Sequence, residues 1–148
     1  MKPFKKILVP VDFSSHSGAA LRYAADLSRR YEASLDVLHV FQTMTYALPE
    51  GYVVPTGSQL QAIMNEFETQ LAAAKRSAEE AGALRVETQL LQGGVATEIL
   101  RCAKERECDL IVMGTHGRTG MKHMLLGSVA EYIVRVAPCP VLTVRAPT

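Results

Sequence analysis

The chain has 148 residues, a length typical of one domain that buries a substantial core. Its hydrophobic fraction of 48% and charged fraction of 21% are ordinary for a globular protein, and its formal net charge is only +1. So small a charge excludes a dedicated nucleic-acid or membrane-surface binder, because such proteins carry a large basic excess. No apolar stretch is long enough to span a bilayer, and we expect a cytoplasmic protein.

The first part of the chain predicts two strands with a helix between them. Residues 5–11 contain the continuous apolar run Ile7-Leu8-Val9, which is typical of a strand buried on both faces. Small and apolar side chains then recur at helical spacing up to Tyr31, and residues 33–41 form the second strand. Residues 42–58 contain prolines and glycines without a clear period and are either a lid or a simple connection.

The rest of the chain continues the alternation of helix and strand. Apolar residues at spacings of four and three predict a helix over 60–81, and residues 84–91 alternate as in an outer strand. After a further helix, residues 110–113 form the fourth strand, and a last helix at 129–136 leads to the fifth strand at 141–144. This alternation predicts an α/β fold, with a mainly parallel sheet covered by helices on both faces.

A glycine-bearing loop with the sequence GTHGRTGMKHMLLGS lies at residues 114–128, between the fourth strand and the last helix. Backbone N–H groups of such a loop, with the positive end of the following helix, can hold a phosphate, because glycine has no Cβ to keep the ligand away. Ser128 adds a hydroxyl donor, whereas Arg118 and Lys122 are either phosphate contacts or solvated surface cations. The loop predicts a phosphate site, the alternative being a structural turn without a ligand.

Two more segments are expected beside this loop, because ligands of parallel α/β sheets bind beyond the carboxyl ends of the strands. Asp12 follows the first strand, Val40 lies at the end of the second and Gly114 follows the fourth. Asp12 either contacts the ligand or caps the first helix, a role that Ser14 and Ser15 can also fill. Distant segments are thus predicted to form one pocket.

Histidines and cysteines raise further alternatives. His16, His39 and His116 all map near this edge, but no short ligand spacing supports a three-histidine metal site. A divalent ion, Mg²⁺ or Mn²⁺, is favoured instead as an ion held through the phosphate oxygens of a bound nucleotide. The three cysteines form no CxxC pair, and we expect them to be reduced and mostly buried.

The chain lacks the two commonest nucleotide-binding motifs and a common hydrolase motif, and its glycine spacing matches another pattern. There is no GxxxxGK[ST] loop, no GxGxxG fingerprint in the first strand–helix turn and no GxSxG elbow. Instead, Gly114, Gly117, Gly127 and Ser128 follow the order glycine, two residues, glycine, nine residues, glycine, serine. With the opening ILVPVD at residues 7–12 and the ending PCPVL at residues 138–142, this pattern resembles the universal stress protein family over the whole chain.

The resemblance implies one three-layer, Rossmann-like α/β domain over residues 1–148, with a five-stranded parallel sheet of order 3-2-1-4-5. It implies ATP, with AMP or cyclic AMP as further candidates, bound between the first and fourth strands. The residues bordering the adenosine would be Pro10, Val11, Asp12 and Val40. Met113 and Gly114 would border the ribose. The phosphates would be held by Gly117, Gly127, Ser128 and Val129, to which the loop itself adds Arg118. The family also commonly forms homodimers through the last strand, here Val141–Val144.

Two classes of function stay open on these grounds. The first is an ATP-binding stress-response regulator, in which the nucleotide orders residues 42–58 and 115–126 and a partner or the dimer responds. The second is a slow ATPase with Asp12 or His116 as base and Arg118 as clamp, although none of them lies in a known catalytic spacing. A receptor for AMP or cyclic AMP is a third possibility. Every strong motif concerns binding, so we favour the regulator.

Overall fold

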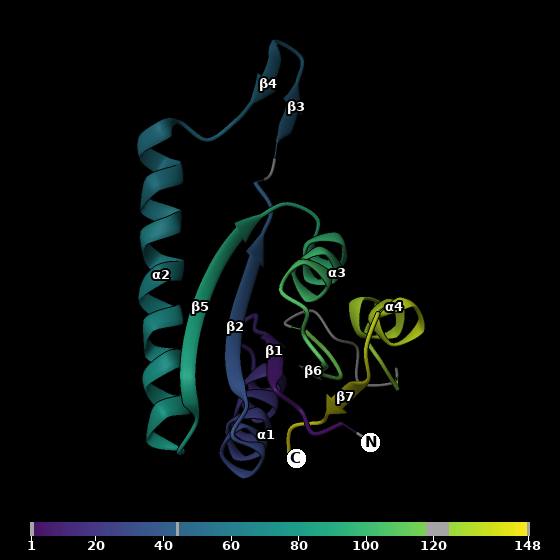
Figure 1. Cartoon of the computed structure of the whole chain (residues 1–148). Coiled ribbons are helices and arrows are strands. Elements are labelled where there is room, and N and C mark those ends of the chain that lie inside the picture. Colours follow the sequence, from purple (N-terminus) through teal and green to yellow (C-terminus); the bar gives the residue numbers. More distant parts are fainter. Residues whose placement is uncertain (1, 44, 118–124, 148) are drawn as a thin grey trace.

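A five-stranded parallel sheet forms the middle layer of the protein (Figure 1). The structure is a computed structural model that describes residues 2–43, 45–117 and 125–147. The strands are β1 (Lys6–Pro10), β2 (Ser34–Phe41), β5 (Leu84–Gln92), β6 (Leu110–Gly114) and β7 (Val141–Val144). They are ordered β5-β2-β1-β6-β7, and every adjacent pair is parallel. Numbered within this sheet alone, the order is 3-2-1-4-5, so the predicted topology is confirmed.

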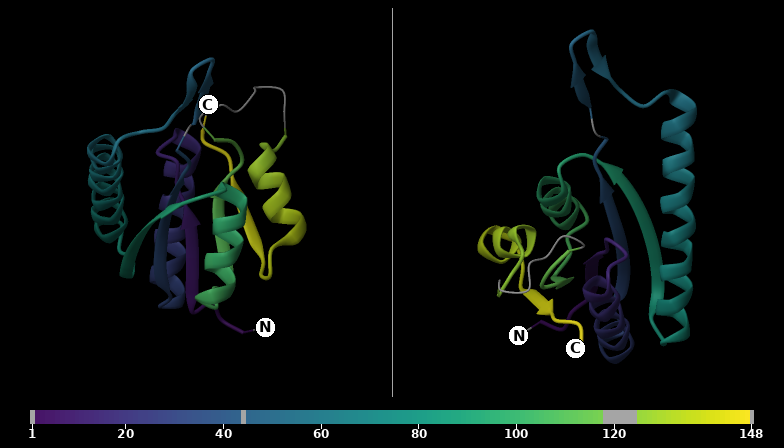
Figure 2. Two further views of the ribbon diagram at one scale, coloured as in Figure 1. Left: turned by 90° about the horizontal axis from the view of Figure 1, so that it is seen from above. Right: turned by 180° about the vertical axis from the view of Figure 1, so that it is seen from behind.

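Two helices cover each face of the sheet (Figures 1 and 2). Helices α1 (Ser15–Tyr31) and α2 (Gly57–Glu80) pack on one face, and α3 (Val95–Glu105) and α4 (Ser128–Val136) pack on the other. None of the helices in the described ranges combines the length and the apolar character needed to cross a membrane.

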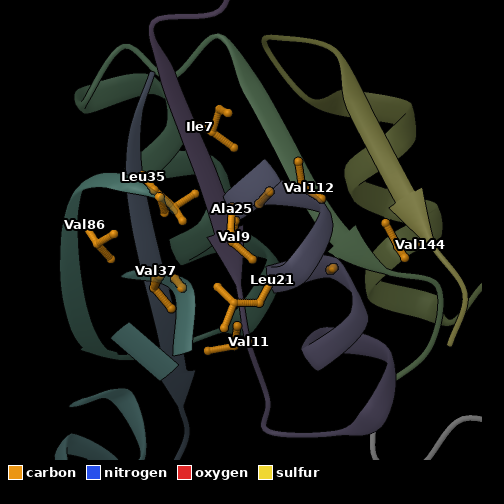
Figure 3. Packing of buried hydrophobic residues seen from close by; sticks show 14 of the residues in the cluster. Ile7, Val9, Val11, Leu21, Ala25, Leu35, Val37, Val86, Val112 and Val144 are labelled. Atoms are coloured by element: carbon orange, nitrogen blue, oxygen red, sulfur yellow. The ribbon is translucent and has the colours of Figure 1, made fainter. Parts of the chain in front are cut away.

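The core explains the continuous apolar run of β1. Ile7 and Val9 point into the cluster under α1 and α2, which Figure 3 shows, whereas Leu8 points into the cluster under α3 and α4. All three side chains are fully buried, because the central strand has neighbours on both edges and helices on both faces. The expected burial of this strand is therefore confirmed.

Residues 42–58 are more regular than predicted. They contain β3 (Tyr46–Leu48) and β4 (Gly51–Val53), which pair as an antiparallel hairpin, and α2 already begins at Gly57. The hairpin extends beyond the carboxyl ends of β2 and β5 (Figure 1), and Tyr52 is 79% exposed. The irregular prediction was wrong here because strands of only three residues are too short to show a hydrophobic period.

A buried ion pair joins the sheet to the end of α3. The Asp36 side chain on β2 is only 2% exposed, and its carboxylate accepts hydrogen bonds from Arg106 Nε at 2.6 Å and Nη2 at 3.2 Å. Arg106 also pairs with Glu87 on β5. Removing one partner would leave a buried charge without compensation, so this pair fixes the relative placement of β2, β5 and α3.

The cysteines lie in or against the cluster under α3 and α4. Cys102 and Cys108 are buried, Cys139 is half-buried, and all three are free thiols, as predicted. Burial raises the pKa of each thiol, and that of Cys108 reaches about 12. These cysteines are therefore poor nucleophiles at neutral pH.

Candidate functional site

A cavity of about 410 Å³ lies at the carboxyl edge of the sheet, bordered by the ends of β1, β2 and β6. Its volume is within the range of small-molecule sites. The predicted site residues that line it are Pro10, Val11, Asp12, Val40, Met113, Gly114, Gly117, Gly127, Ser128 and Val129. Arg118 and Lys122 lie outside the described residues. The structure thus brings the described candidates together, while their role in binding stays a prediction.

The lining divides by element into apolar and polar parts. Helix α3 contributes Val95 and Ile99, and β2 contributes Leu38 beside Val40. Ser17, Thr115 and His116 add polar groups from α1 and from the segment after β6. An apolar wall with a few polar groups is the usual character of a site for a small organic ligand. No motif in the sequence connects Val95 or Ile99 with the site.

The start of α1 holds Asp12. One carboxylate oxygen, Oδ1, accepts a hydrogen bond from the Ser14 N–H at 3.0 Å, and the Asp12 N–H donates to Ser17 Oγ at 3.3 Å. The N-cap of α1 is Ser14, whose hydroxyl accepts from the Ser17 N–H, so the alternative in which Asp12 caps this helix is wrong. The other oxygen, Oδ2, faces Gly117, where a Cβ would lie only 2.8 Å from it.

Phe13 is a site-supporting residue that sequence reasoning missed. Its backbone has a φ of +65°, a left-handed conformation that is strained for a bulky residue. Its ring lies 4.7 Å from the His39 ring and 6.4 Å from the Phe67 ring on α2. His39 in turn donates from Nδ1 to the Val11 carbonyl oxygen at 2.7 Å. These contacts hold the segment between β1 and α1, and no sequence motif indicates them.

Gly114, at the end of β6, and Gly127, at the end of the following loop, are required by the structure for different reasons. A Cβ on Gly114 would lie 2.8 Å from the backbone carbon of His16, so β6 approaches α1 too closely for any side chain. Gly127 is the N-cap of α4, and its N–H donates to the Thr115 carbonyl oxygen at 2.7 Å. A Cβ there would lie 3.3 Å from that same oxygen. Gly114 is therefore needed for packing, and Gly127 keeps the loop close to the helix.

The start of α4 is suited to an anion. Its N-cap residue, Gly127, has no side chain to cap the first turn, and the turn itself, from Ser128 to Ala130, lines the cavity. The first N–H groups of a helix have no partner within the helix and carry partial positive charge. A phosphate placed here would accept hydrogen bonds from these groups.

The three histidines near this edge lie in different surroundings. The described parts of the chain, which include all three residues, contain no group of three or more His, Cys, Asp or Glu side chains that could hold a metal ion. The rings of His16 and His116 are 5.4 Å apart, but His16 Nδ1 accepts the Ala146 N–H at 3.0 Å. His39 instead packs against Phe13 and Phe67.

Comparisons with known proteins agree with this architecture. The model of the universal stress protein family matches residues 3–145. Universal stress protein MJ0531 of Methanocaldococcus jannaschii is 37% identical over 145 residues, which are 97% of this chain and 84% of that protein. The universal stress protein UspA from Lactobacillus plantarum has a TM-score of 0.79 at 27% identity, covering 98% of this chain and all of that one.

Two similar solved structures contain adenine nucleotides. A universal stress protein in complex with cAMP has a TM-score of 0.71 at 25% identity and covers 99% of this chain and 100% of that one. The universal stress protein from Archaeoglobus fulgidus in complex with dAMP has a TM-score of 0.67 at 26% identity and covers 97% of this chain and 99% of that one. From its sequence, its sheet topology and these matches, the chain belongs to the universal stress protein family.

Proposed function

We propose that this protein is a regulator that binds ATP or a related adenine nucleotide in the cavity at the ends of β1, β2 and β6. The observation that carries the proposal is the uncapped start of α4, which lines the same cavity as the apolar side chains of β2 and α3. Such a cavity offers an apolar slot for a base and a site for a phosphate. The cAMP and dAMP complexes of the two similar structures support an adenine nucleotide.

The lining suggests how the nucleotide would lie. The base would pack among the apolar side chains of β2 and α3, near the Val40 backbone. Asp12 would accept a hydrogen bond from the base or the ribose. Gly117 and the N–H groups of Ser128 and Val129 would surround the phosphates. A Mg²⁺ or Mn²⁺ ion would be held mainly by phosphate oxygens, because the described residues offer no cluster of protein ligands.

A homodimer through β7 would transmit the nucleotide state to a second copy. The carbonyl oxygens of Pro140 and Val144 accept from the N–H groups of Ile111 on β6 and of Thr115 directly after it. Since alternate residues of a strand face opposite edges, Val141 and Thr143 turn their backbone groups to the outer edge of the sheet. An edge of this kind pairs readily with a second strand. Thr143→Pro would remove one outward N–H and should shift the wild-type dimer toward monomer in sedimentation experiments.

Slow hydrolysis of ATP is a second candidate, favoured only by the presence of a carboxylate and an imidazole in one cavity. Asp12 and His116 both line it. Phosphate release faster than a few per hour, lost in Asp12→Ala or His116→Ala while binding is retained, would support an enzyme. We expect no such turnover, because neither side chain lies in a recognised catalytic arrangement.

The test begins with native mass spectrometry of freshly purified protein, followed by acid release and identification of any bound small molecule. Calorimetric titrations with ATP, AMP and cAMP in the presence of Mg²⁺ follow, with GTP as the control for base selectivity. We expect about one adenine nucleotide per chain and weaker binding of GTP. A protein that purifies empty and takes up none of the adenine nucleotides would overturn the proposal.

A further inference from the structure

The segment after β7 returns to the start of α1. The Ala146 N–H donates a hydrogen bond to His16 Nδ1 at 3.0 Å, joining residues that are 130 positions apart. Ala146 also packs against the core cluster under α1 and α2. Figure 1 shows the C-terminal end beside α1. Since His16 lies in the first turn of α1, the end of the chain contacts the helix that begins at the cavity.

This hydrogen bond selects one form of the His16 ring. A backbone N–H can only donate, so Nδ1 must be the acceptor and carries no proton. The neutral ring then has its proton on Nε2, whereas a protonated ring has two donors and cannot accept the amide. The Ala146 amide therefore favours the tautomer of His16 that carries its proton on Nε2.

His16 lies next to a residue of the cavity wall. Its ring centroid is 5.4 Å from that of His116, which lines the cavity and whose Nδ1 lies 3.0 Å from Thr115 Oγ1. The Thr115 N–H donates to the Val144 carbonyl oxygen at 2.9 Å. The end of β7 thus contacts Thr115 directly, and the segment after β7 contacts His16, which in turn lies beside His116.

We propose that His16 and the backbone amide of Ala146 are a positioning pair for the phosphate end of the nucleotide site. The amide fixes the tautomer and orientation of the His16 ring, and this ring supports His116 beside the cavity. The inference rests on the proposed nucleotide binding and adds a dependence on the C-terminal segment. The residues after β7 act on affinity through His16, although Ala146 is not among the described residues that line the cavity.

The decisive variant is Ala146→Pro, which deletes the donor N–H and leaves the His16 side chain intact. Ala146→Ser keeps the N–H and serves as the matched control. Calorimetry with AMP and ATP should show affinity about fivefold weaker for Ala146→Pro, the size of one lost hydrogen bond, and unchanged for Ala146→Ser. The melting temperatures of both variants check that the fold is intact. ¹⁵N chemical shifts of the His16 ring should show the Nε2–H tautomer in the wild type and a mixture in Ala146→Pro.

A second background separates positioning from general stabilisation. In His16→Leu the link is already broken, so adding Ala146→Pro should cause no further loss of affinity. Equal affinity of Ala146→Pro and Ala146→Ser would overturn the inference, as would a loss that persists in the His16→Leu background. These outcomes differ from a wild type that binds no adenine nucleotide, because that result refutes the proposed function itself.

Discussion

The helices on the two faces of the sheet begin in different ways. On one face, Ser14 caps α1, and Thr56 caps α2 in a capping box with Gln59. On the other face, α3 and α4 begin after Gly94 and Gly127, and neither glycine supplies a side-chain cap. Side-chain caps stabilise a helix by occupying its first N–H groups. The uncapped helices are those whose first residues line the cavity.

The difference shows which helix has first-turn N–H groups that its own N-cap side chain does not occupy. Ser17 of α1 also lines the cavity, but its N–H is already used by the Ser14 hydroxyl. At the start of α4 the N-cap is Gly127, which has no hydroxyl or carboxylate to occupy the first N–H groups in this way. The α1 and α2 face thus contributes stability from its caps, and the α3 and α4 face gives up that contribution where the phosphate is proposed to bind.

The largest effect is expected when α4 is given a cap. Gly127→Asp would place a carboxylate on the first-turn N–H groups and beside the phosphate, so we expect affinity for AMP to fall about 100-fold in calorimetry. Gly94→Asp is the matched control, because it caps α3, where we propose that the base rather than the phosphate binds. Equal losses in the two variants would contradict the assignment of the phosphate to α4.

Gly114→Ala should have the next largest effect, which is a decrease in the free energy of unfolding. Its methyl group would lie 2.8 Å from the His16 backbone carbon, and overpacking of this kind costs about 2 kcal/mol in the free energy of unfolding. Urea denaturation measures this loss. Gly57→Ala is the control, since no atom lies within 4 Å of a Cβ at that position. A Gly114→Ala protein as stable as Gly57→Ala would mean that β6 and α1 are less tightly packed than described.

Thr56→Ala tests the capped face. The change removes the acceptor for the Gln59 N–H, and we expect a loss of about 1 kcal/mol in the free energy of unfolding. Adenine nucleotide affinity should stay unchanged, because Thr56 does not line the cavity. Thr69→Ala, in the middle of α2, should cost little, since its hydroxyl only bonds back to the Asn65 carbonyl oxygen. A drop in affinity for Thr56→Ala would show that the two faces are not independent.

The smallest expected effect is a change in how the free energy of unfolding depends on pH when a buried thiol under α3 and α4 is removed. Burial raises the pKa of Cys108 to about 12, so this thiol ionises in the unfolded chain at a lower pH than in the folded protein. The stabilisation that the protonated thiol gives the folded protein is complete below the unfolded pKa. It is lost as pH rises through the interval between about 9 and 12. Denaturation at pH 7 and pH 10 should therefore show a smaller alkaline loss in Cys108→Ala than in the wild type. Identical pH dependence would place this thiol in contact with water.

Much of the fold was predictable because it follows from local patterns. The continuous apolar run of β1, the helical stripe of α2 and the regular alternation of elements each have a clear period. The resemblance supplied the strand order, and the rule that ligands bind beyond the carboxyl ends of parallel strands indicated which segments meet at the cavity. The edge position of β5 could also be predicted, since its apolar and polar residues alternate, and the strand does lie at the end of the sheet.

The features that could not be predicted depend on contacts between residues far apart in the sequence, which leave no hydrophobic period in the sequence itself. The hairpin has strands too short to show one. The left-handed backbone at Phe13 is imposed by packing on His39 and Phe67, and nothing in its neighbours indicates it. The same holds for the buried pair of Asp36 and Arg106, because a charge in the middle of a strand reads as an exposed position until its partner is known.

The position of β1 has a consequence for how the chain folds. Among the strands of this sheet, the central one is synthesised first, and its neighbour β6 pairs Leu110 with Ile7. Until about 100 further residues have been synthesised, this strand, with its buried apolar run, has one unpaired edge. Sheets that rely on such distant pairings fold slowly, and their exposed edges favour aggregation. Nascent chains that end before β6 should therefore depend on chaperones, whereas chains that include β6 should not.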